Sequence, residues 1–387
     1  MNVVPLGDLV KSAPVERAGN RSYTVLSMTR SAGLVPQVTV FKKAVASRDL
    51  SNYKIVRPNQ LVVGIHIDEG ALGVSGPDQI GIVSPAYTLW DIKEEAHIDP
   101  VFLDRFIRSP QAVVYFISKY RETAERRGKL TREHFLDLRV PLPPLAEQKR
   151  ITAILDAADA LRARRRAALA QLDTLLQATF LDLFGDPVTN PMGWEIVNCQ
   201  DVCTRITVGI VVKPASYYQE EGVPALRSLN VRANRIETTD LVYVSREHNE
   251  TILKKTRVWR GDVVLVRSGQ PGTAAIVPDE LDGTNAIDIL IATPDQRKVH
   301  PVYLCNYFNS PGGKRMALGE QRGQIQKHLN AGALKCAPIP LPPLNLQHRF
   351  AMLVESIEQQ RASMRAHLTE LDMLFASLQS RAFNGEL

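Results

Sequence analysis

One long internal repeat limits the possible fold more than any other feature of the chain. Residues 141–184 align without a gap with residues 340–383, at an offset of 199 positions. Both copies begin with Pro-Leu-Pro-Pro-Leu, and Gln148 of the first copy recurs as Gln347 of the second. Weaker similarity extends upstream of both copies. The 387 residues are therefore expected to form two copies of one unit, each a globular part followed by a long segment.

Each repeated segment has the pattern of one long amphipathic helix. Apolar residues of the first copy recur every three or four positions, at Leu169, Leu172, Leu176, Phe180 and Leu183. A proline pair cannot lie inside a helix and marks each start, whereas Gly185 and Gly385 mark the ends. The sequence predicts two helices of about 35–38 residues, roughly 55 Å long. Their apolar stripes are expected to pack on each other, although a coiled-coil dimerisation arm is an alternative.

The remaining segments are expected to form mixed domains. Apolar runs around turn residues predict strand–turn–strand units at residues 53–65 and 256–266. Helical patterns cover residues 101–120 and 302–318, each interrupted at a Ser-Pro pair. The predicted class is α+β, with two mixed α/β domains separated by two long antiparallel, coiled-coil-like helices in a pseudo-twofold repeat. The expected parts are a first domain at 1–140, a first helix at 141–186, a second domain at 187–338 and a second helix at 339–387.

The positive charge is concentrated in the two expected domains. The chain carries a formal net charge of +6, and the domains account for +4 and +3 while the helices carry 0 and −1. A nonspecific polycation would spread its charge more evenly. Two basic domains on neutral helices indicate two separate contact zones for an anionic partner such as nucleic acid.

Motifs of catalytic or metal sites are absent from the sequence. There is no G-x-G-x-x-G, P-loop, H-E-x-x-H or G-x-S-x-G pattern, and the eight histidines do not cluster. Cys199 and Cys203 lack a second pair, so we expect buried thiols rather than a zinc site. The N-terminus does not resemble a signal peptide and no long apolar run occurs, which predicts a cytoplasmic protein without a membrane contact. We therefore expect a binding protein with no catalytic residue and no metal.

The repeated motif carries a resemblance to a known family. Two variable domains, each followed by Pro-Leu-Pro-Pro-Leu-x-x-Gln-x-Arg and a long helix, resemble the specificity (S) subunit of type I restriction–modification systems. Leu183–Pro187 running into Gly193-Trp194 is similar to the family's link between the first helix and the second domain. Gly261–Val264 with Arg267–Gly269, and Gly323–Lys327, are also similar to family segments.

The resemblance implies how such a chain works. The domains would be target-recognition domains, each reading one half of a split DNA sequence, and the antiparallel helices would set the unread spacer. Two separate modification subunits would methylate DNA with S-adenosylmethionine. Separate restriction subunits would use ATP and Mg²⁺ for translocation and cleavage. The chain itself would be a non-catalytic subunit that binds no cofactor. Because the two domains differ strongly in sequence, the target is expected to be asymmetric.

Two other interpretations stay open. The chain could be the specificity chain of a related restriction system whose methylation and cleavage activities lie in one partner chain. It could also be a scaffold whose helices assemble other proteins without reading DNA.

Candidate DNA contacts are basic or amide residues in segments that can approach a groove or a phosphate. Each of them alone is more often a solvated surface residue than a DNA contact. In the first domain they are Arg30, Lys42, Lys43, Arg126, Arg127, Lys129 and Arg132. In the second domain they are Lys213, Arg227, Arg267, Ser268, Gln270, Arg322, Gln324 and Lys327.

Arginines on the helices are candidates for docking the modification subunits. Their alternative role is that of a solvated helix face with acidic neighbours. The candidates are Arg162, Arg164, Arg165, Arg166, Arg361 and Arg365.

Overall fold

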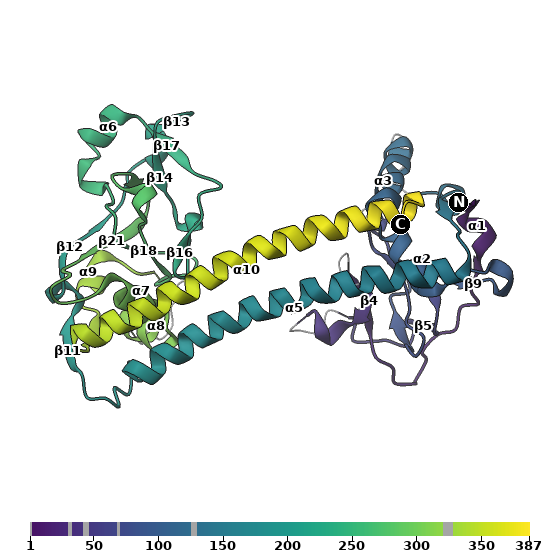
Figure 1. The fold of residues 1–387 in the computed structure, drawn as a ribbon, viewed down its shortest axis with the longest axis horizontal. Helices are drawn as coiled ribbons and strands as arrows, with labels where there is room; N and C mark the ends of the chain where they lie inside the picture. The colour runs from purple at the N-terminus through teal and green to yellow at the C-terminus, as the bar shows by residue number, and fades with distance from the viewer. Residues whose placement is uncertain (1, 30–32, 42–45, 68–69, 125–129, 320–327) are drawn as a thin grey trace. The chain divides into compact units, whose positions relative to one another are not determined.

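The computed structural model of the chain describes residues 2–29, 33–41, 46–67, 70–124, 130–319 and 328–387 (Figure 1). The chain divides into two compact units, and each contains a part of both long helices. The first unit holds residues 1–166 and 366–387, and the second holds residues 167–365. Both units combine helices with strands, which confirms the predicted α+β class.

The first unit contains a central antiparallel sheet of four strands in the order β2-β9-β6-β7. These strands are β2 (Val10–Ser12), β6 (Gln60–Val63), β7 (Leu72–Val74) and β9 (Thr88–Ile92). Three smaller pairs are β1 (Val3–Pro5) with β10 (Arg139–Pro141), β3 (Leu26–Thr29) with β4 (Gly33–Pro36), and β5 (Lys54–Val56) with β8 (Gly81–Val83). The domain helices are α1 (Leu6–Leu9), α2 (Pro100–Ile107), α3 (Pro110–Ala124) and α4 (Arg132–Leu136).

The second unit contains two four-stranded sheets. The first has the order β12-β21-β18-β19, from β12 (Cys203–Val208), β18 (Val263–Val266), β19 (Ala274–Ile276) and β21 (Ile289–Pro294). The second has the order β13-β17-β14-β20, from β13 (Tyr218–Gln219), β14 (Val223–Leu226), β17 (Val242–Val244) and β20 (Asn285–Ala286). Two pairs are β11 (Glu195–Asn198) with β22 (Pro338–Leu341) and β15 (Val231–Arg232) with β16 (Arg235–Ile236). The domain helices are α6 (Arg246–Glu250), α7 (Pro301–Asn309), α8 (Pro311–Leu318) and α9 (Ala331–Lys335).

The internal repeat includes the central sheets, where the sequence similarity is weak. The order β2-β9-β6-β7 of the first unit corresponds to β12-β21-β18-β19 of the second. Gln60 Oε1 accepts the backbone N–H of Arg57 (2.8 Å) in front of β6. Asp262 Oδ2 accepts the backbone N–H of Trp259 (2.9 Å) at the same place in front of β18. The two domains therefore share one scaffold although most of their side chains differ.

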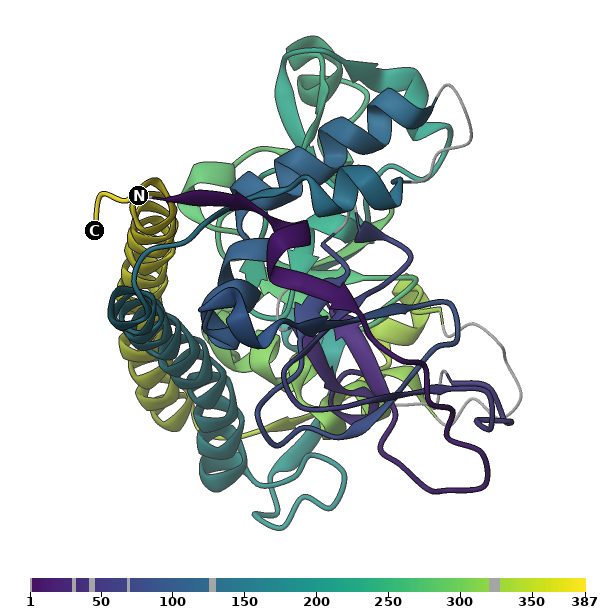
Figure 2. The same ribbon diagram turned by 90° about the vertical axis from the view of Figure 1, so that its right-hand side faces the viewer.

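The two long helices begin and end where the sequence predicted. Helix α5 (Leu145–Phe184) has 40 residues and helix α10 (Leu344–Asn384) has 41, slightly more than predicted. Each begins directly after its proline pair. Gly185 and Gly385, which follow the helices, have φ values of +76° and +78°, a conformation that glycine adopts without a Cβ clash. Inside each unit, the segments of the two helices that belong to it lie side by side (Figures 1 and 2).

Inside each unit the helix segments pack antiparallel and join the domain core. In the first unit, Ile151 and Leu155 of α5 belong to the same buried cluster as Phe383 of α10. The Phe383 ring contacts Phe102 and Phe106 of α2 edge to face, at centroid distances of 5.7 and 5.2 Å. In the second unit, the predicted stripe residues of α5 pack with α10 and α7, in a cluster that includes Leu172, Leu176, Phe180, Phe350, Val354 and Tyr303.

The repeated glutamine of the helix-start motif ties each helix to its domain. Gln148 is fully buried, accepts the backbone N–H of Asp99 (2.7 Å) and donates to the Pro143 carbonyl (2.8 Å). Gln347 repeats this arrangement with the N–H of His300 (2.8 Å) and the Pro342 carbonyl (2.7 Å). Asp99 and His300 are the N-cap residues of α2 and α7. The motif therefore fixes the start of each long helix to the start of a domain helix.

Of the two strand–turn–strand predictions, the first was confirmed and the second was wrong in part. Strands β5 and β6 form the unit predicted at residues 53–65, although they belong to different sheets. In the second copy β18 forms, but the strand expected at residues 256–258 does not: Thr256 ends a 3₁₀ turn at Lys254–Thr256, and Arg257 makes only a single bridge to Asn285. Short apolar runs do not determine which strands pair, because pairing depends on distant segments. The predicted breaks at the Ser-Pro pairs are confirmed between α2 and α3 and between α7 and α8.

Among the described residues, no helix is both long enough and apolar enough to span a membrane.

Candidate nucleic-acid interface

One edge of the β12-β21-β18-β19 sheet, at which β12 and β18 end and β21 begins, brings together those second-domain candidates that the structure describes. The register pairs Val208 with Leu290, and Val266 with Ile289, so β12 and β18 end where β21 begins. Ile210 and Leu226 both hydrogen-bond through their carbonyls to the segment that precedes β21, at Asp288 (3.1 Å) and Ile287 (2.7 Å). The chain near Lys213, the chain at Arg227 and the loop that follows β18 therefore converge on Ile287-Asp288.

A network of four polar side chains fixes the loop between β18 and β19. The Arg267 guanidinium donates to Asp288 Oδ1 (2.5 Å) and, from Nη2, to His328 Nε2 (3.0 Å). Ser268 Oγ lies 2.7 Å from His328 Nδ1. Because arginine only donates, Nε2 is the acceptor and the proton of the neutral imidazole is on Nδ1, from which it reaches Ser268. The Arg267 carbonyl also accepts the N–H of Leu329 (2.9 Å).

The network divides the predicted loop residues into two roles. Arg267 is only 17% exposed at its side chain, and its charge faces Asp288. Ser268, Gly269 and Gln270 are exposed at the loop tip. A Cβ on Gly269 would meet no atom within 4 Å, so the tip is open. Arg267 therefore holds the loop, whereas Gln270 has the exposure that contact with a groove needs.

Lys213 and Arg227 also differ in exposure. Lys213 is exposed and follows Val211 and Val212, which are 48% and 73% exposed. The Arg227 guanidinium donates to the Asp240 carbonyl (2.9 Å) and pairs with its carboxylate (3.2 Å). Lys213 can therefore approach a phosphate, while Arg227 stabilises a turn beside the same edge.

In the first domain the structure describes one candidate, Arg132. Its guanidinium lies 5.0 Å from the centroid of the Trp90 ring and donates to Ser12 Oγ (3.1 Å). Ser12 and Trp90 are register partners in β2 and β9. Arg132 is exposed beside these strands, and the aromatic ring holds it there. The candidates Arg30, Lys42, Lys43, Arg126, Arg127, Lys129, Arg322, Gln324 and Lys327 lie outside the described residues.

Two of the helix arginines take part in the packing of the helix pair. In the first unit, Arg162 pairs with Asp372 of α10 (2.6 Å) and lies 4.3 Å from the centroid of the Phe375 ring. In the second unit, Arg361 of α10 pairs with Asp173 of α5 (2.5 Å) and with Glu358. These ion pairs join repeat-equivalent residues.

The other docking candidates differ in surroundings. Arg166 also reaches Asp372, at 3.0 Å. Arg164 and Arg365 are exposed, and Arg165 is half-buried. The docking hypothesis therefore applies most directly to Arg164 and Arg165.

The described part of the chain holds no constellation of catalytic groups. No group of three His, Cys, Asp or Glu residues in it could hold a metal ion. Cys199 and Cys203 lie with their sulfurs 3.9 Å apart, and burial raises the pKa of the Cys305 thiol to about 12. Burial likewise raises the pKa of Tyr303 well above its ordinary value. Cys305 and Tyr303 therefore stay protonated near neutral pH, and both are part of the buried core.

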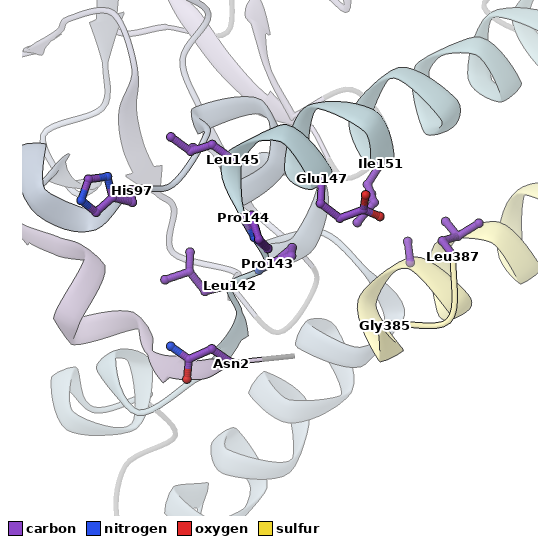
Figure 3. A pocket seen from close by; sticks show the side chains of 11 residues that line it. Asn2, His97, Leu142, Pro143, Pro144, Leu145, Glu147, Ile151, Gly385 and Leu387 are labelled. Atoms are coloured by element: carbon purple, nitrogen blue, oxygen red, sulfur yellow. The ribbon is translucent and has the colours of Figure 1, made fainter.

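A hollow of about 470 Å³ lies in the first unit at the start of α5 (Figure 3). The helix-start motif lines much of it, with Pro143, Pro144 and Leu145 on one side and Leu387 on another. Its titratable side chains are His97 and Glu147 alone among the lining residues. A mostly apolar wall with two separate titratable groups does not have the convergent polar groups of an active site.

Asp288 and His328 were not predicted from the sequence. Asp288 has φ +49°, an uncommon conformation for a residue other than glycine. No motif surrounds either residue, and their partners lie 21 and 61 positions away in the chain. Only the charge of Asp288 and the position of His328 directly after Lys327 could have drawn attention to them.

Known proteins resemble this chain in sequence and in fold. Residues 114–171 match the family model "Type I restriction modification DNA specificity domain". The type I restriction enzyme EcoBI specificity subunit of Escherichia coli is 25% identical over 283 residues, covering 65% of this chain and 59% of the relative. The EcoKI specificity subunit of Escherichia coli K12 is 25% identical over 278 residues, covering 65% and 58%. The chain thus spans about three fifths of these relatives' length.

A solved structure on the complex assembly and conformational transition of the type I R-M system contains a chain of similar fold. Its TM-score is 0.62 at 19% identity, and the match covers 100% of this chain and 98% of that one. The family resemblance predicted from the repeated motif is therefore confirmed.

Proposed function

We propose that this chain is the specificity subunit of a type I restriction–modification complex and recognises a split sequence in duplex DNA. The observation that carries the proposal is that both copies of the repeat share one domain scaffold and one way of attaching the domain to its long helix. Two domains have the same central strand order, and each is tied to a long helix by an equivalent buried glutamine, Gln148 or Gln347. A chain that presents two related domains on a helix pair suits a target with two half-sites.

The two domains are proposed to read different half-sites. The proposed domains are residues 1–140 and 187–338, and the proposed helices are residues 141–186 and 339–387. In the second domain, the edge around Ile287-Asp288 offers an exposed loop tip at Ser268–Gln270 together with Lys213. The first domain offers Arg132 beside Trp90 at the corresponding sheet. Because these contact residues differ, the target is asymmetric.

Catalysis is proposed to belong to partner subunits, and this chain is the non-catalytic member of the complex. Two modification subunits would bring S-adenosylmethionine and methylate the DNA. Restriction subunits would bring ATP and Mg²⁺. Arg164 and Arg165 of α5 are proposed to contact the modification subunits, since the guanidinium groups of Arg162 and Arg361 already pair between the helices.

Selection of duplexes from a randomised pool tests the proposal. The full chain, assembled with its modification subunit, is expected to enrich two short conserved blocks separated by a fixed number of unselected base pairs. Enrichment of one continuous block, or of no sequence, would contradict it. A scaffold that does not read DNA predicts the second of these results.

A further inference from the structure

A lysine outside the predicted candidates lies at the base of the loop between β18 and β19. Lys314 is in α8, and its ammonium donates to Thr273 Oγ1 (3.3 Å). A Cβ on Gly272 would lie 3.6 Å from its Cγ. Gly272 and Thr273 are the last residues of the loop whose tip is Ser268–Gln270. The side chain of Lys314 therefore runs along the closing end of this loop.

The position of Lys314 is fixed by the corner between α7 and α8. Asn309, just before that corner, accepts the N–H of Ala274 (3.0 Å) and donates to the Ala274 carbonyl (2.9 Å). Ala274 is the first residue of β19. Ser310 caps α8 by accepting the N–H of Gly313 (3.0 Å). These bonds hold the first turn of α8, and Lys314 with it, at the sheet edge that gathers Arg267, Asp288 and the chain near Lys213.

The charge of Lys314 has no partner in the part of the chain that the structure describes. No carboxylate there lies within 4 Å of its ammonium, and the hydroxyl of Thr273 is a neutral acceptor. The side chain is half-buried, and this burial lowers the pKa of its amine. Removing a cation from water without a counter-charge is unfavourable. The charge of Arg267, at the other end of the same loop, already faces Asp288.

The first copy of the repeat indicates that the scaffold does not need a cation here. The Ser-Pro pairs at 109–110 and 310–311 align the two helices, and this alignment places Val113 of α3 opposite Lys314 of α8. Val113 is also half-buried. An apolar side chain therefore fills this position in one domain. The second domain carries a half-buried ammonium at the same place, and packing alone does not require its charge.

We propose that Lys314 binds a backbone phosphate of the DNA at the foot of the loop formed by residues 267–273. This inference rests on the proposed function and adds a contact to it. A phosphodiester oxygen would supply the missing counter-charge for the ammonium. Such a contact positions the domain on the duplex and carries no sequence information of its own. It would place the loop tip, with Gln270, toward the base edges beside that phosphate.

The test compares two lysines at opposite edges of one sheet. The control is Lys298, which donates to the Asp201 carbonyl (2.8 Å) beyond the end of β21 where β12 begins. Lys314→Met and Lys298→Met each remove one positive charge and keep a long side chain. Binding of the full chain with its modification subunit is measured against salt concentration, on the selected target and on unrelated duplex.

The slope of log K against log salt is negative, and we expect Lys314→Met to make it less steep by about 0.9. This corresponds to a roughly eightfold weaker affinity at about 0.1 M salt. The loss should be similar on both duplexes, Lys314→Arg should keep the slope, and Lys298→Met should leave it unchanged. A wild-type slope for Lys314→Met would overturn the inference while leaving the proposed function intact. No sequence-specific binding by the wild type would overturn both.

Folding is checked with a second variant. Lys314→Val places the first copy's residue in α8 and is expected to unfold at the wild-type temperature. If both Lys314→Met and Lys314→Val unfold well below Lys298→Met, the lysine supports the fold and the inference is wrong.

Discussion

Single buried polar residues carry much of the connection between helices and domains. Gln148 and Gln347 each satisfy a backbone N–H at the N-cap of a domain helix and a carbonyl of the proline motif. Both are fully buried. A buried amide that makes two or three hydrogen bonds fixes direction as well as distance, which an apolar side chain of the same volume would not do.

Gln148→Ala should therefore destabilise the chain beyond the loss of its side-chain packing. Truncation leaves the Asp99 N–H and the Pro143 carbonyl unsatisfied, which costs about 1–3 kcal/mol for each buried group. Denaturant unfolding measures the change. Gln177→Ala is the matched control, because Gln177 is exposed on the same helix, and it should change stability by less than about 0.5 kcal/mol. Equal stability of the two variants would show that the glutamine bonds are not needed.

The N-cap of α7 predicts that the stability of the chain depends on pH. His300 accepts the N–H of Val302 through Nδ1 (3.2 Å), which requires the neutral ring. Burial, and then the nearby His348, lower the pKa of His300 below its ordinary value. The unfolded chain binds a proton as the pH falls through about 6.5, whereas the folded chain resists it, so stability decreases in that range.

Unfolding free energies at about pH 7 and about pH 5.5 check this effect. His300→Asp, which places the N-cap residue of the first copy at α7, should lose less stability on acidification than the wild type. The same loss in both would assign the acid sensitivity to other groups.

At the scale of elements, ion pairs set the register of the helix pair. Arg162 with Asp372 and Arg361 with Asp173 are repeat-equivalent pairs, one in each unit. Arg361 is only 6% exposed at its side chain, whereas Asp173 is 72% exposed. Such a pair adds modest stability. A shifted register that placed a like charge opposite the buried guanidinium of Arg361 would be unfavourable, even if it kept the apolar stripe buried.

Asp173→Lys should lower the free energy of unfolding by about 1–2 kcal/mol, because it places a second cation beside Arg361. Asp182→Lys, an identical charge change at an exposed position of the same helix, should have an effect under about 0.5 kcal/mol. Urea denaturation compares the two variants. A null result for Asp173→Lys would remove the ion pair from the account of register.

The elements could be predicted from sequence where the signal is local, and the site could not. The prolines, glycines and apolar stripe gave the long helices nearly to the residue, because helix ends and faces depend on neighbours in the chain. The sequence singled out the loop at Arg267–Gln270 as a candidate DNA contact, which stays a prediction. Its anchors, Asp288 and His328, lie far away in sequence and are joined only by folding. Lys314 could have been noticed by aligning α8 with α3, where a valine and a lysine are paired.

At the scale of the whole molecule, the length of the two helices is proposed to set the length of the unread spacer between the half-sites. Seven residues add nearly two complete turns, about 10 Å, and so nearly preserve the phase of the apolar stripe. Inserting seven residues after Ala167 and after Ala366 should lengthen the preferred spacer by about three base pairs, at 3.4 Å each. Binding to duplexes whose spacers differ by one base pair measures it. An unchanged spacer would show that helix length does not set it. Insertion into one helix alone should disrupt the packing of α5 against α10.

The central claim, that this chain specifies a split asymmetric DNA target, is tested most directly by mapping methylated bases in a host without other methyltransferases. The host carries the chain together with its modification subunit, and a matched strain carries the modification subunit alone. We predict methylation at one motif of two different short blocks separated by a fixed gap, and its loss without the chain. Methylation at a continuous site, or methylation that persists when the chain is removed, would contradict the account.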